Sequence, residues 1–401
     1  MKWLISIHKY IPDRVGGTAV YVKRFIDSLL ANNHEVTLIT STNIEKLPEY
    51  EKNGNLEVYK VYFKTGSVGP LRFKQRKIYT DKINEILAKN HFDIVNIHTS
   101  GCFNDSFFTQ KRNYKLIFTL HAVVSYELLF DLKKTVFSLK NLHETIKFPM
   151  KYLLQSKSEK TACLNADKII VMSEYVKGTI KKYLCPECLN KVCVTGIGVS
   201  PISDLPKISR EEARDSLSIN KNDKLFVTVR RLVPRMGLFN LIKAFSFVKD
   251  DSARLLLIGK GQLYENLNNY IKKLNLQDKV KLVGYVENDL LHYYYCTADC
   301  FILPTEELEG FGISTIEALS YNLPVIGTPR GATPEILTKF DKNLITRTHK
   351  PKDLYEKIEY YLKNQDKYRD IDFDKKVNNY YNWNVLTDRI INSIYAEHKE
   401  D

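Results

Sequence analysis

Long apolar runs are absent from this 401-residue sequence, and so are repeats rich in glycine or proline. Since about 18 consecutive apolar residues are needed to cross a bilayer, the sequence predicts no membrane-spanning helix. Its 17 glycines and 13 prolines exclude collagen-like and low-complexity chains, and an apolar content of 44% excludes intrinsic disorder. At roughly 100–200 residues per domain, the length predicts two domains.

No secretory signal is recognisable at the N-terminus, where residues 2–8 have the pattern of a short strand and no small-residue cleavage site follows. Seven cysteines are an odd number, which favours free thiols in a reducing cytoplasm. Cys185, Cys188 and Cys193 resemble part of a zinc site. A structural zinc site needs four ligands and no further Cys or His lies close by, so we expect no metal.

The net charge of +13 is unevenly distributed along the chain. Residues 1–200 contain 30 Lys and Arg against 18 Asp and Glu, whereas residues 201–401 contain 30 against 29. The first half therefore has a net charge of +12, which attracts acidic lipid headgroups, nucleic acid or phosphorylated substrates. A solvated basic surface that keeps the protein in solution explains the same charge equally well.

Strands alternate with helices through the first half, which predicts a mostly parallel sheet with helices on both faces. After Gly16 and Gly17, Thr18 is positioned to cap a helix whose apolar residues recur at helical spacing. Residues 121–165 have the character of loop and helix without a clear pattern. The expected strands span residues 2–8, 35–40, 57–62, 93–98, 115–120 and 168–172.

The alternation starts again after Pro201 and Pro206, which mark a linker between two domains. The expected domains are residues 1–200 and 201–375, and a C-terminal helix at about 376–401 is expected to cross back onto the first domain. Because a doubly wound sheet binds ligands at the carboxyl ends of its strands, two such sheets facing across a cleft bind one substrate each. In the second domain, strands are expected at residues 224–229, 254–258, 279–283, 299–303 and 324–327, and helices at 238–249, 262–274, 287–297, 312–321 and 351–363.

The most informative segment runs from a strand end near Leu303 into a helix that begins near Gly312. The N–H groups of a helix N-terminus bind phosphate, and Gly310 and Gly312 let a ligand approach the backbone closely. Glu309 and Glu317 stand eight residues apart at the same place. Since carboxylates repel phosphate but accept hydrogen bonds from sugar hydroxyls, a nucleotide-sugar satisfies both groups. A polar helix start with two solvated glutamates is the plain structural alternative.

Glu309, Gly310, Phe311 and Gly312, together with Glu317, resemble the E-x7-E signature of retaining glycosyltransferases of family 4, which have the GT-B fold. The resemblance extends over most of the chain, and the number, order and spacing of its motifs make it specific. The other matching segments are Pro12, residues 16–18 with Tyr21, residues 34–37, 93–98, 119–121 and 166–173, and in the second half residues 231–234 with Gly237, 258–261, 283–286, 298–299, 324–326 and 331–335.

The resemblance implies a donor site in the second domain. Glu309 is expected to bond the hydroxyls of the donor sugar, Glu317 those of the ribose, and Arg231 is expected to neutralise the diphosphate as it leaves. The remaining donor-site residues, which act through their backbone or meet the nucleobase, are Gly310, Phe311, Gly312, Ile313 and Tyr285.

The resemblance also implies roles in the first domain. Gly16 and Gly17 are expected to close on the phosphates, and His121 is expected to lie near the reacting centre of the sugar. His98 is as readily a structural histidine as a functional one. Ser173 caps the following helix as readily as it touches an acceptor.

One segment of the second domain departs from the family pattern. Where the family commonly has Lys before Gly237, this chain has Met236, which Arg235 precedes. Since a thioether does not neutralise phosphate, Arg235 is expected to supply the second cation, with Lys260 as the alternative. Arg230 stands where Gly is frequent in the family, so the local backbone is not determined by the resemblance.

The implied activity is that of a retaining glycosyltransferase that needs neither metal nor cofactor and moves a hexose-type sugar from a UDP- or GDP-linked donor. Lipid-linked or glycan acceptors are typical of the family, so polysaccharide or glycolipid assembly at the cell surface is the expected setting. The protein is expected in the cytoplasm or peripherally on the inner face of the membrane, with basic residues 72–77 and 133–160 on anionic lipid. No nucleic-acid partner is expected.

Three other functions fit parts of the pattern. A nucleotide-sugar epimerase shares the two-domain fold, and a phosphorylase of the glycogen type needs a lysine-bound pyridoxal phosphate. A nucleic-acid-binding protein would explain the positive charge. None of the three accounts for paired glutamates beside a glycine turn as directly as glycosyl transfer does.

Overall fold

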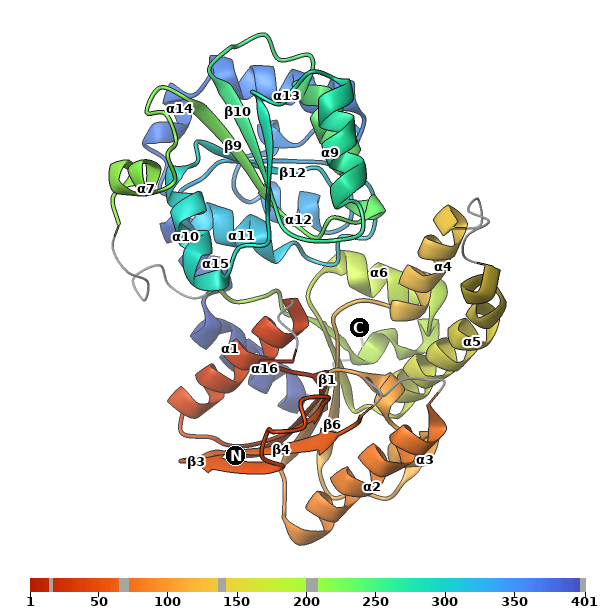
Figure 1. The fold of residues 1–401 in the computed structure, drawn as a ribbon. Helices are drawn as coiled ribbons and strands as arrows, with labels where there is room; N and C mark the ends of the chain where they lie inside the picture. Colours follow the sequence, from red (N-terminus) through yellow and green to blue (C-terminus); the bar gives the residue numbers. More distant parts are fainter. Residues whose placement is uncertain (14–16, 65–71, 136–141, 200–207, 397–401) are drawn as a thin grey trace. The chain divides into compact units, whose positions relative to one another are not determined.

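The computed structural model describes residues 1–13, 17–64, 72–135, 142–199 and 208–396, and the chain divides into two units (Figure 1). Unit 1 contains Met1–Gly198 and Trp383–Asp401, and unit 2 contains Val199–Asn382. Each unit is built on one mostly parallel sheet with helices packed against it. The expectation of two doubly wound sheets is therefore confirmed. The expected linker residues Pro201 and Pro206 lie outside the described residues.

The sheet of unit 1 has eight strands in the order β3-β4-β2-β1-β5-β6-β7-β8. All neighbours are parallel except β3 and β4, which form an antiparallel edge. The short strands β3 and β8 were not expected, because the first is wholly exposed and the second has three residues. The strands are β1 (Lys2–Lys9), β2 (Glu35–Thr42), β3 (Tyr50–Asn53), β4 (Leu56–Tyr62), β5 (Ile94–Ile97), β6 (Lys115–Leu120), β7 (Lys168–Val171) and β8 (Val192–Val194).

The helices of unit 1 cover a sheet whose central strands are almost continuous runs of buried residues, as a sheet covered on both faces requires. Helix α1 spans Gly17–Ala31, so Thr18 lies inside the helix and the expectation that it caps the helix is wrong. Residues 121–165, which lacked a clear pattern, contain α4 and α5. The helices are α1 (Gly17–Ala31), α2 (Phe73–Lys89), α3 (Asp105–Thr109), α4 (Val124–Thr135), α5 (Leu142–Asn165), α6 (Glu174–Tyr183) and α16 (Trp383–Tyr395).

A buried carboxylate explains why α4 could not be read from local pattern. Glu159 of α5 accepts hydrogen bonds from the backbone N–H groups of Val124 (2.8 Å) and Ser125 (3.2 Å) and from the Ser125 hydroxyl (2.6 Å). It thus binds the first N–H groups of α4, which have no partner within that helix. Burial raises the pKa of Glu159, although the hydrogen bonds from Ser125 act in the opposite direction.

The C-terminal segment divides between the two units. Helix α16 lies beside α1 in unit 1 (Figure 1), and Thr387 Oγ1 is 2.8 Å from Ser28 Oγ in their buried contact. Arg389 Nη1 also donates to the carbonyl of Thr195 at 2.7 Å. The residues from 376 to 382, expected to belong to the returning helix, instead end α15 and remain in unit 2.

The sheet of unit 2 has five parallel strands in the order β11-β10-β9-β12-β13. The strands are β9 (Lys224–Val229), β10 (Ala253–Ile258), β11 (Val280–Gly284), β12 (Cys300–Leu303) and β13 (Val325–Gly327). The helices are α7 (Arg210–Ser216), α8 (Leu238–Phe245), α9 (Tyr264–Lys273), α10 (Asn288–Thr297), α11 (Ile313–Ser320), α12 (Thr333–Leu337), α13 (Pro351–Lys363), α14 (Asp366–Arg369) and α15 (Phe373–Tyr381).

Two of the seven cysteines are not free. Cys185 and Cys188 are buried and joined by a disulfide, so the expectation of free thiols is wrong for this pair. The same two residues were the strongest part of the zinc pattern. Within the described part of the chain, no group of three or more Cys, His, Asp or Glu residues is arranged to hold a metal ion.

The docking of α16 depends on a glycine. A Cβ built on Gly198 would lie 2.5 Å from Cδ2 of the Trp383 indole, and that ring contacts Tyr21 at 5.2 Å between centroids. We expect Gly198→Ala to push the indole away and to lower the free energy of unfolding of unit 1 by about 1–3 kcal/mol. Both tryptophans of the chain, Trp3 and Trp383, lie in unit 1, so tryptophan fluorescence during urea unfolding measures this change.

Gly178 provides the matched control. It lies inside α6, and a Cβ built on it meets no atom within 4 Å. Gly178→Ala is therefore expected to raise stability by about 0.5–1 kcal/mol, because alanine is the better helix former. Equal effects of the two substitutions would contradict the role assigned to Gly198.

Candidate functional site

The order of strands in unit 2 creates a switch point between β9 and β12. The chain leaves β9 toward β10 on one side, whereas β12 pairs with β9 on the other side, through Cys300 with Phe226 and Phe301 with Val227. The segments that follow these two parallel strands meet at one edge of the sheet. Open α/β sheets bind ligands at such an edge. Here the two segments are residues 230–237 and 304–312, which contain most of the expected donor-site residues.

The first of these segments holds the second in place. The carbonyl of Arg235 accepts hydrogen bonds from the N–H groups of Glu306 (2.9 Å) and Glu307 (3.2 Å). The Arg235 side chain also donates from Nη1 to the carbonyl of Leu308 (2.6 Å). Gly237 has φ +71°, and a Cβ there would lie 1.9 Å from the Pro304 oxygen. The guanidinium of Arg235, expected to bind phosphate, thus contacts the turn itself.

Glu309 is fixed from a third segment. Its carbonyl accepts a hydrogen bond from the N–H of Ala332 at 2.9 Å. Gly331 has φ +59°, and a Cβ on it would lie 2.2 Å from the same carbonyl oxygen. The Glu309 side chain is only 14% exposed, and Thr305 Oγ1 donates to its Oε2 at 3.1 Å. This carboxylate is therefore positioned within a closely packed turn.

Arg230 is the residue of this site that sequence reasoning missed. Its Nη2 donates a hydrogen bond to Oε2 of Glu309 and forms an ion pair with it, and its side chain is only 5% exposed. Nε and Nη2 also contact Sδ of Met236, at 3.2 and 2.8 Å. Its neighbour Arg231, the expected diphosphate ligand, is exposed at the edge of the sheet. The signal was present in the sequence as an Arg at a position where the family has Gly.

Helix α11 begins at the expected place. Gly312, at φ +88°, is its N-cap, and no side chain caps the helix there. Phe311 is buried, and its ring packs on Tyr381 at 5.7 Å, so only the backbone of Gly310–Ile313 is suited to meet a ligand. Glu317 lies one turn further along, where the buried Tyr295 hydroxyl donates to its Oε2 at 3.0 Å.

Tyr285 follows β11 at the same edge of the sheet and is 44% exposed. The Nζ of Lys260 lies 4.1 Å from the centre of its ring, which is a close cation–π contact. The Tyr285 hydroxyl also donates to Oε2 of Glu287 at 3.1 Å. An exposed ring with a cation over one face offers its other face as a stacking surface for a flat group such as a nucleobase.

The two histidines that follow β5 and β6 of unit 1 face each other. Nδ1 of His98 and Nε2 of His121 are 3.0 Å apart, and their rings are stacked with centroids 5.2 Å apart. Tyr21 of α1 packs on His121 at 4.9 Å. Burial lowers the pKa of His121 to about 4, and burial together with the neighbouring His121 lowers that of His98 well below its ordinary value. The lowered pKa values favour the neutral form of both rings, in which one of the facing nitrogens donates a hydrogen bond to the other.

Two further expectations in unit 1 have structural outcomes. Ser173 is the N-cap of α6, since its hydroxyl accepts from the N–H of Val176 at 3.1 Å, which is the structural alternative stated above. Gly17 is the first residue of α1, whereas Gly16 lies outside the described residues.

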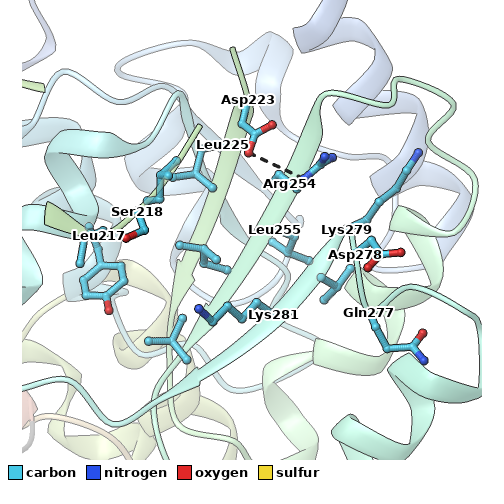
Figure 2. Close-up of a pocket in the computed structure, with 15 residues that line it drawn as sticks. Leu217, Ser218, Asp223, Leu225, Arg254, Leu255, Gln277, Asp278, Lys279 and Lys281 are labelled. Atoms are coloured by element: carbon cyan, nitrogen blue, oxygen red, sulfur yellow. Dashed lines mark ion pairs between the residues drawn. The ribbon is translucent and has the colours of Figure 1, made fainter. Parts of the chain in front are cut away.

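A cavity of about 230 Å³ in unit 2 lies away from these residues (Figure 2). It is lined by the amino-terminal parts of β9 and β10, by β11 and by residues 217–219, which follow α7. Arg254 Nε lies 3.7 Å from Asp223 on its wall. No expected donor-site residue lines it. In the described part of the chain, no helix combines the length and the apolar character needed to cross a bilayer.

The fold and the edge of unit 2 define an α/β protein in which polar residues and glycines gather at a strand switch point. Family models identify the class. The model "Glycosyl transferases group 1" matches residues 209–376, and the model "Glycosyltransferase Family 4" matches residues 15–201. The two models together match most of the chain, which belongs to the GT4-type glycosyltransferases and has the GT-B fold.

Curated relatives agree with this class. The chain is 26% identical over 352 residues to an uncharacterized glycosyltransferase of Methanocaldococcus jannaschii, with 84% of this chain and 83% of that protein covered. It is 27% identical over 177 residues to a GDP-mannose-dependent alpha-(1-6)-phosphatidylinositol monomannoside mannosyltransferase of Mycobacterium tuberculosis. The second match covers 42% of this chain and 46% of the relative.

Solved structures share the fold across the whole chain. Sucrose-phosphate synthase from Thermosynechococcus elongatus has a TM-score of 0.77 at 17% identity, with 97% of each chain covered. Anabaena HepE in complex with UDP and glucose has a TM-score of 0.69 at 15% identity, with 98% of this chain and 99% of that chain covered. At these identities the likeness concerns the fold alone. No comparison supports an epimerase or a nucleic-acid-binding protein.

The buried histidine pair predicts a loss of stability in acid. Unfolded histidines titrate near pH 6.5, so their stabilising contribution is complete above that pH and is lost as the pH falls toward 4. We expect the free energy of unfolding of unit 1 to fall by up to about 1.4 kcal/mol per pH unit for each histidine in this range. Urea unfolding followed by tryptophan fluorescence between pH 7 and 4.5 measures the slope.

His98→Asn and His121→Asn should each reduce the slope, whereas His91→Asn, at a side chain that is 68% exposed, should not. A slope unchanged in all three variants would show that the two buried rings are not the groups that titrate.

Proposed function

We propose that this glycosyltransferase moves a sugar from a nucleoside-diphosphate sugar to an acceptor hydroxyl with retention of configuration and without a metal ion. The observation that carries the proposal is the meeting of residues 230–237, the Glu309 turn and the N-terminus of α11 at one strand switch point. This edge combines cations and the N–H groups of a helix N-terminus, which suit phosphate, with carboxylates, which suit sugar hydroxyls. The UDP and glucose bound by Anabaena HepE, which has the same fold, support a donor of this class.

The donor is assigned to unit 2, one group at a time. Tyr285 stacks on the base, Glu317 accepts from the ribose hydroxyls, and Glu309 accepts from hydroxyls of the transferred sugar. Arg231 and the N-terminus of α11 bind the diphosphate. Tyr295, which donates to Oε2 of Glu317, fixes that carboxylate for the ribose.

The main electrostatic demand of the reaction is the negative charge that grows on the leaving diphosphate. Arginine guanidinium groups and the N–H groups of a helix N-terminus stabilise that charge without a metal ion. Unit 1 is assigned to the acceptor, with His121 as a neutral hydrogen-bonding group held by His98 and Tyr21. Its lowered pKa keeps the ring uncharged at neutral pH. The proton of the acceptor hydroxyl passes to an oxygen of the departing phosphate.

Isothermal titration with UDP, GDP, ADP and dTDP tests the donor site. We expect one nucleotide to bind the wild-type protein much more tightly than the others. Glu317→Ala and Arg231→Ala should each weaken that binding by roughly tenfold or more, because each removes a charge-assisted hydrogen bond. Arg347→Ala is the control, since Arg347 is exposed and binds Asp353 and Glu356.

Absence of binding to all four nucleotides would overturn the nucleoside-diphosphate donor. With the donor known, the anomeric configuration of the product in NMR spectra tests retention, and activity in excess chelator tests independence from metal. An inverted product or loss of activity in chelator would remove the corresponding part of the proposal.

We also propose that the acceptor is lipid-linked and that α5 contacts an anionic membrane. Met150 and Leu153 on this helix are 59% and 63% exposed, and the exposed Lys151 stands between them in sequence. The phosphatidylinositol-based acceptor in the name of the mycobacterial relative supports such an acceptor. The expected basic segment 72–77 contributes less than its sequence indicated, because Arg76 is buried and donates to the carbonyl of Phe103.

Cosedimentation with vesicles tests this contact. At low salt, we expect the protein to sediment with vesicles that contain phosphatidylglycerol and not with neutral phosphatidylcholine vesicles. The double substitution Met150→Ser/Leu153→Ser should reduce the bound fraction severalfold, because it removes the apolar side chains that enter the interface. Sedimentation unchanged by acidic vesicles would refute membrane contact by this helix.

A further inference from the structure

Arg230 contains a buried donor without a partner. Its side chain is 5% exposed, and Nη1 has no hydrogen-bond partner among the described residues. A buried unpaired donor on a charged group is costly, so its presence beside a ligand site indicates a partner that the ligand supplies. Glu309 does not fill this role, because it accepts from Nη2.

The guanidinium is held in position from two sides. Met236 contacts it through Sδ, at 3.2 Å from Nε and 2.8 Å from Nη2, and Glu309 binds Nη2. Arginine presents its donors in a planar fork, so fixing Nε and Nη2 also fixes the direction of Nη1. The remaining donor is therefore pre-oriented before any ligand arrives.

Two departures from the family pattern compensate each other. Position 236 is Met where Lys is common, and position 230 is Arg where Gly is common. The Arg230 guanidinium lies against the sulfur of Met236. Arg230 therefore places a positive charge at the end of the uncharged Met236 side chain. A cation lost at one position is thus restored from the other.

We propose that Arg230 is the second cation of the donor site and that its Nη1 donates to a phosphate oxygen of the nucleoside-diphosphate sugar. This inference rests on the proposed function. When the bond between the anomeric carbon and the phosphate oxygen breaks, its electron pair stays on that oxygen, and Arg230 and Arg231 share the resulting charge. The acceptor oxygen forms the new bond to the anomeric carbon, and its proton goes to the phosphate. Arg230 then links the leaving group to Glu309, which binds the transferred sugar.

The two cations expected for this role from the sequence are engaged elsewhere. Arg235 donates to the carbonyl of Leu308 and holds the turn of Glu309. Lys260 lies over the ring of Tyr285. Arg230 combines burial, a fixed orientation and a donor with no partner in the described structure.

Isothermal titration of the full chain with UDP, GDP, ADP, dTDP, their nucleosides and inorganic pyrophosphate tests the assignment. Arg230→Met should weaken the preferred nucleoside diphosphate and pyrophosphate by about tenfold or more and leave the nucleoside unchanged, since only phosphate loses a partner. Arg230→Lys, which keeps the charge, should lose less. The double substitution Arg230→Gly/Met236→Lys should restore binding to within about threefold of wild type.

Arg254→Met is the matched control, because it removes an arginine that pairs with Asp223 at the amino-terminal part of the same sheet. Thermal unfolding midpoints close to that of the wild type establish that the variants are folded. Equal weakening of nucleoside and nucleoside diphosphate in Arg230→Met would overturn the proposal, because it would show that Arg230 only shapes the turn. So would unchanged affinity for every ligand.

The binding results distinguish an incorrect role for Arg230 from an incorrect nucleoside-diphosphate donor. Wild-type binding to a nucleoside diphosphate that Arg230→Met leaves intact would refute Arg230 alone. Wild-type binding to pyrophosphate but to no nucleotide, weakened in Arg230→Met, would refute the nucleotide donor and retain Arg230 as a phosphate ligand. Absence of binding to pyrophosphate and nucleotides alike would refute both.

Discussion

The close approach of three backbone segments at the carboxyl edge of the second sheet is the constraint on which the candidate site depends. Side chains are excluded at Gly237 and Gly331, because a Cβ would lie 1.9 Å and 2.2 Å from the carbonyl oxygens of Pro304 and Glu309. Both glycines have positive φ, which residues with side chains rarely adopt. These close approaches hold the turn of residues 304–309 between two backbone segments, and this turn positions the Glu309 carboxylate and the start of α11.

Most of the polar side chains at the candidate sites already have hydrogen-bond partners within the protein. Glu309 has Arg230 and Thr305, and Glu317 has Tyr295. In unit 1, His98 and His121 satisfy each other's facing nitrogens. Pre-paired groups of this kind need little reorganisation when charge develops during a reaction, and this is the chief electrostatic advantage that an enzyme has over water.

Much of this architecture could be predicted from the sequence. The buried strands of both sheets and the turn from Leu303 to Gly312 were recognisable, because hydrophobic runs and glycine positions are local signals. The contact of Arg230 with Glu309 could not be predicted, since it joins residues 79 positions apart and follows from the pairing of β9 with β12. The position of helix α4 within residues 121–165 could not be predicted for a similar reason, because its first N–H groups are bound by Glu159 of another helix.

The return of α16 to unit 1 makes that unit discontinuous in sequence. A ribosome releases the chain from its N-terminus, so all of unit 2 emerges before Trp383 does. Until then the face of α1 that carries Ser28 and Tyr21 lacks the helix that covers it. The last residue of unit 2, Asn382, is synthesised before the last segment of unit 1, although most of unit 1 precedes unit 2 in the sequence. The nascent unit 1 therefore completes its core only when translation has reached the last helix.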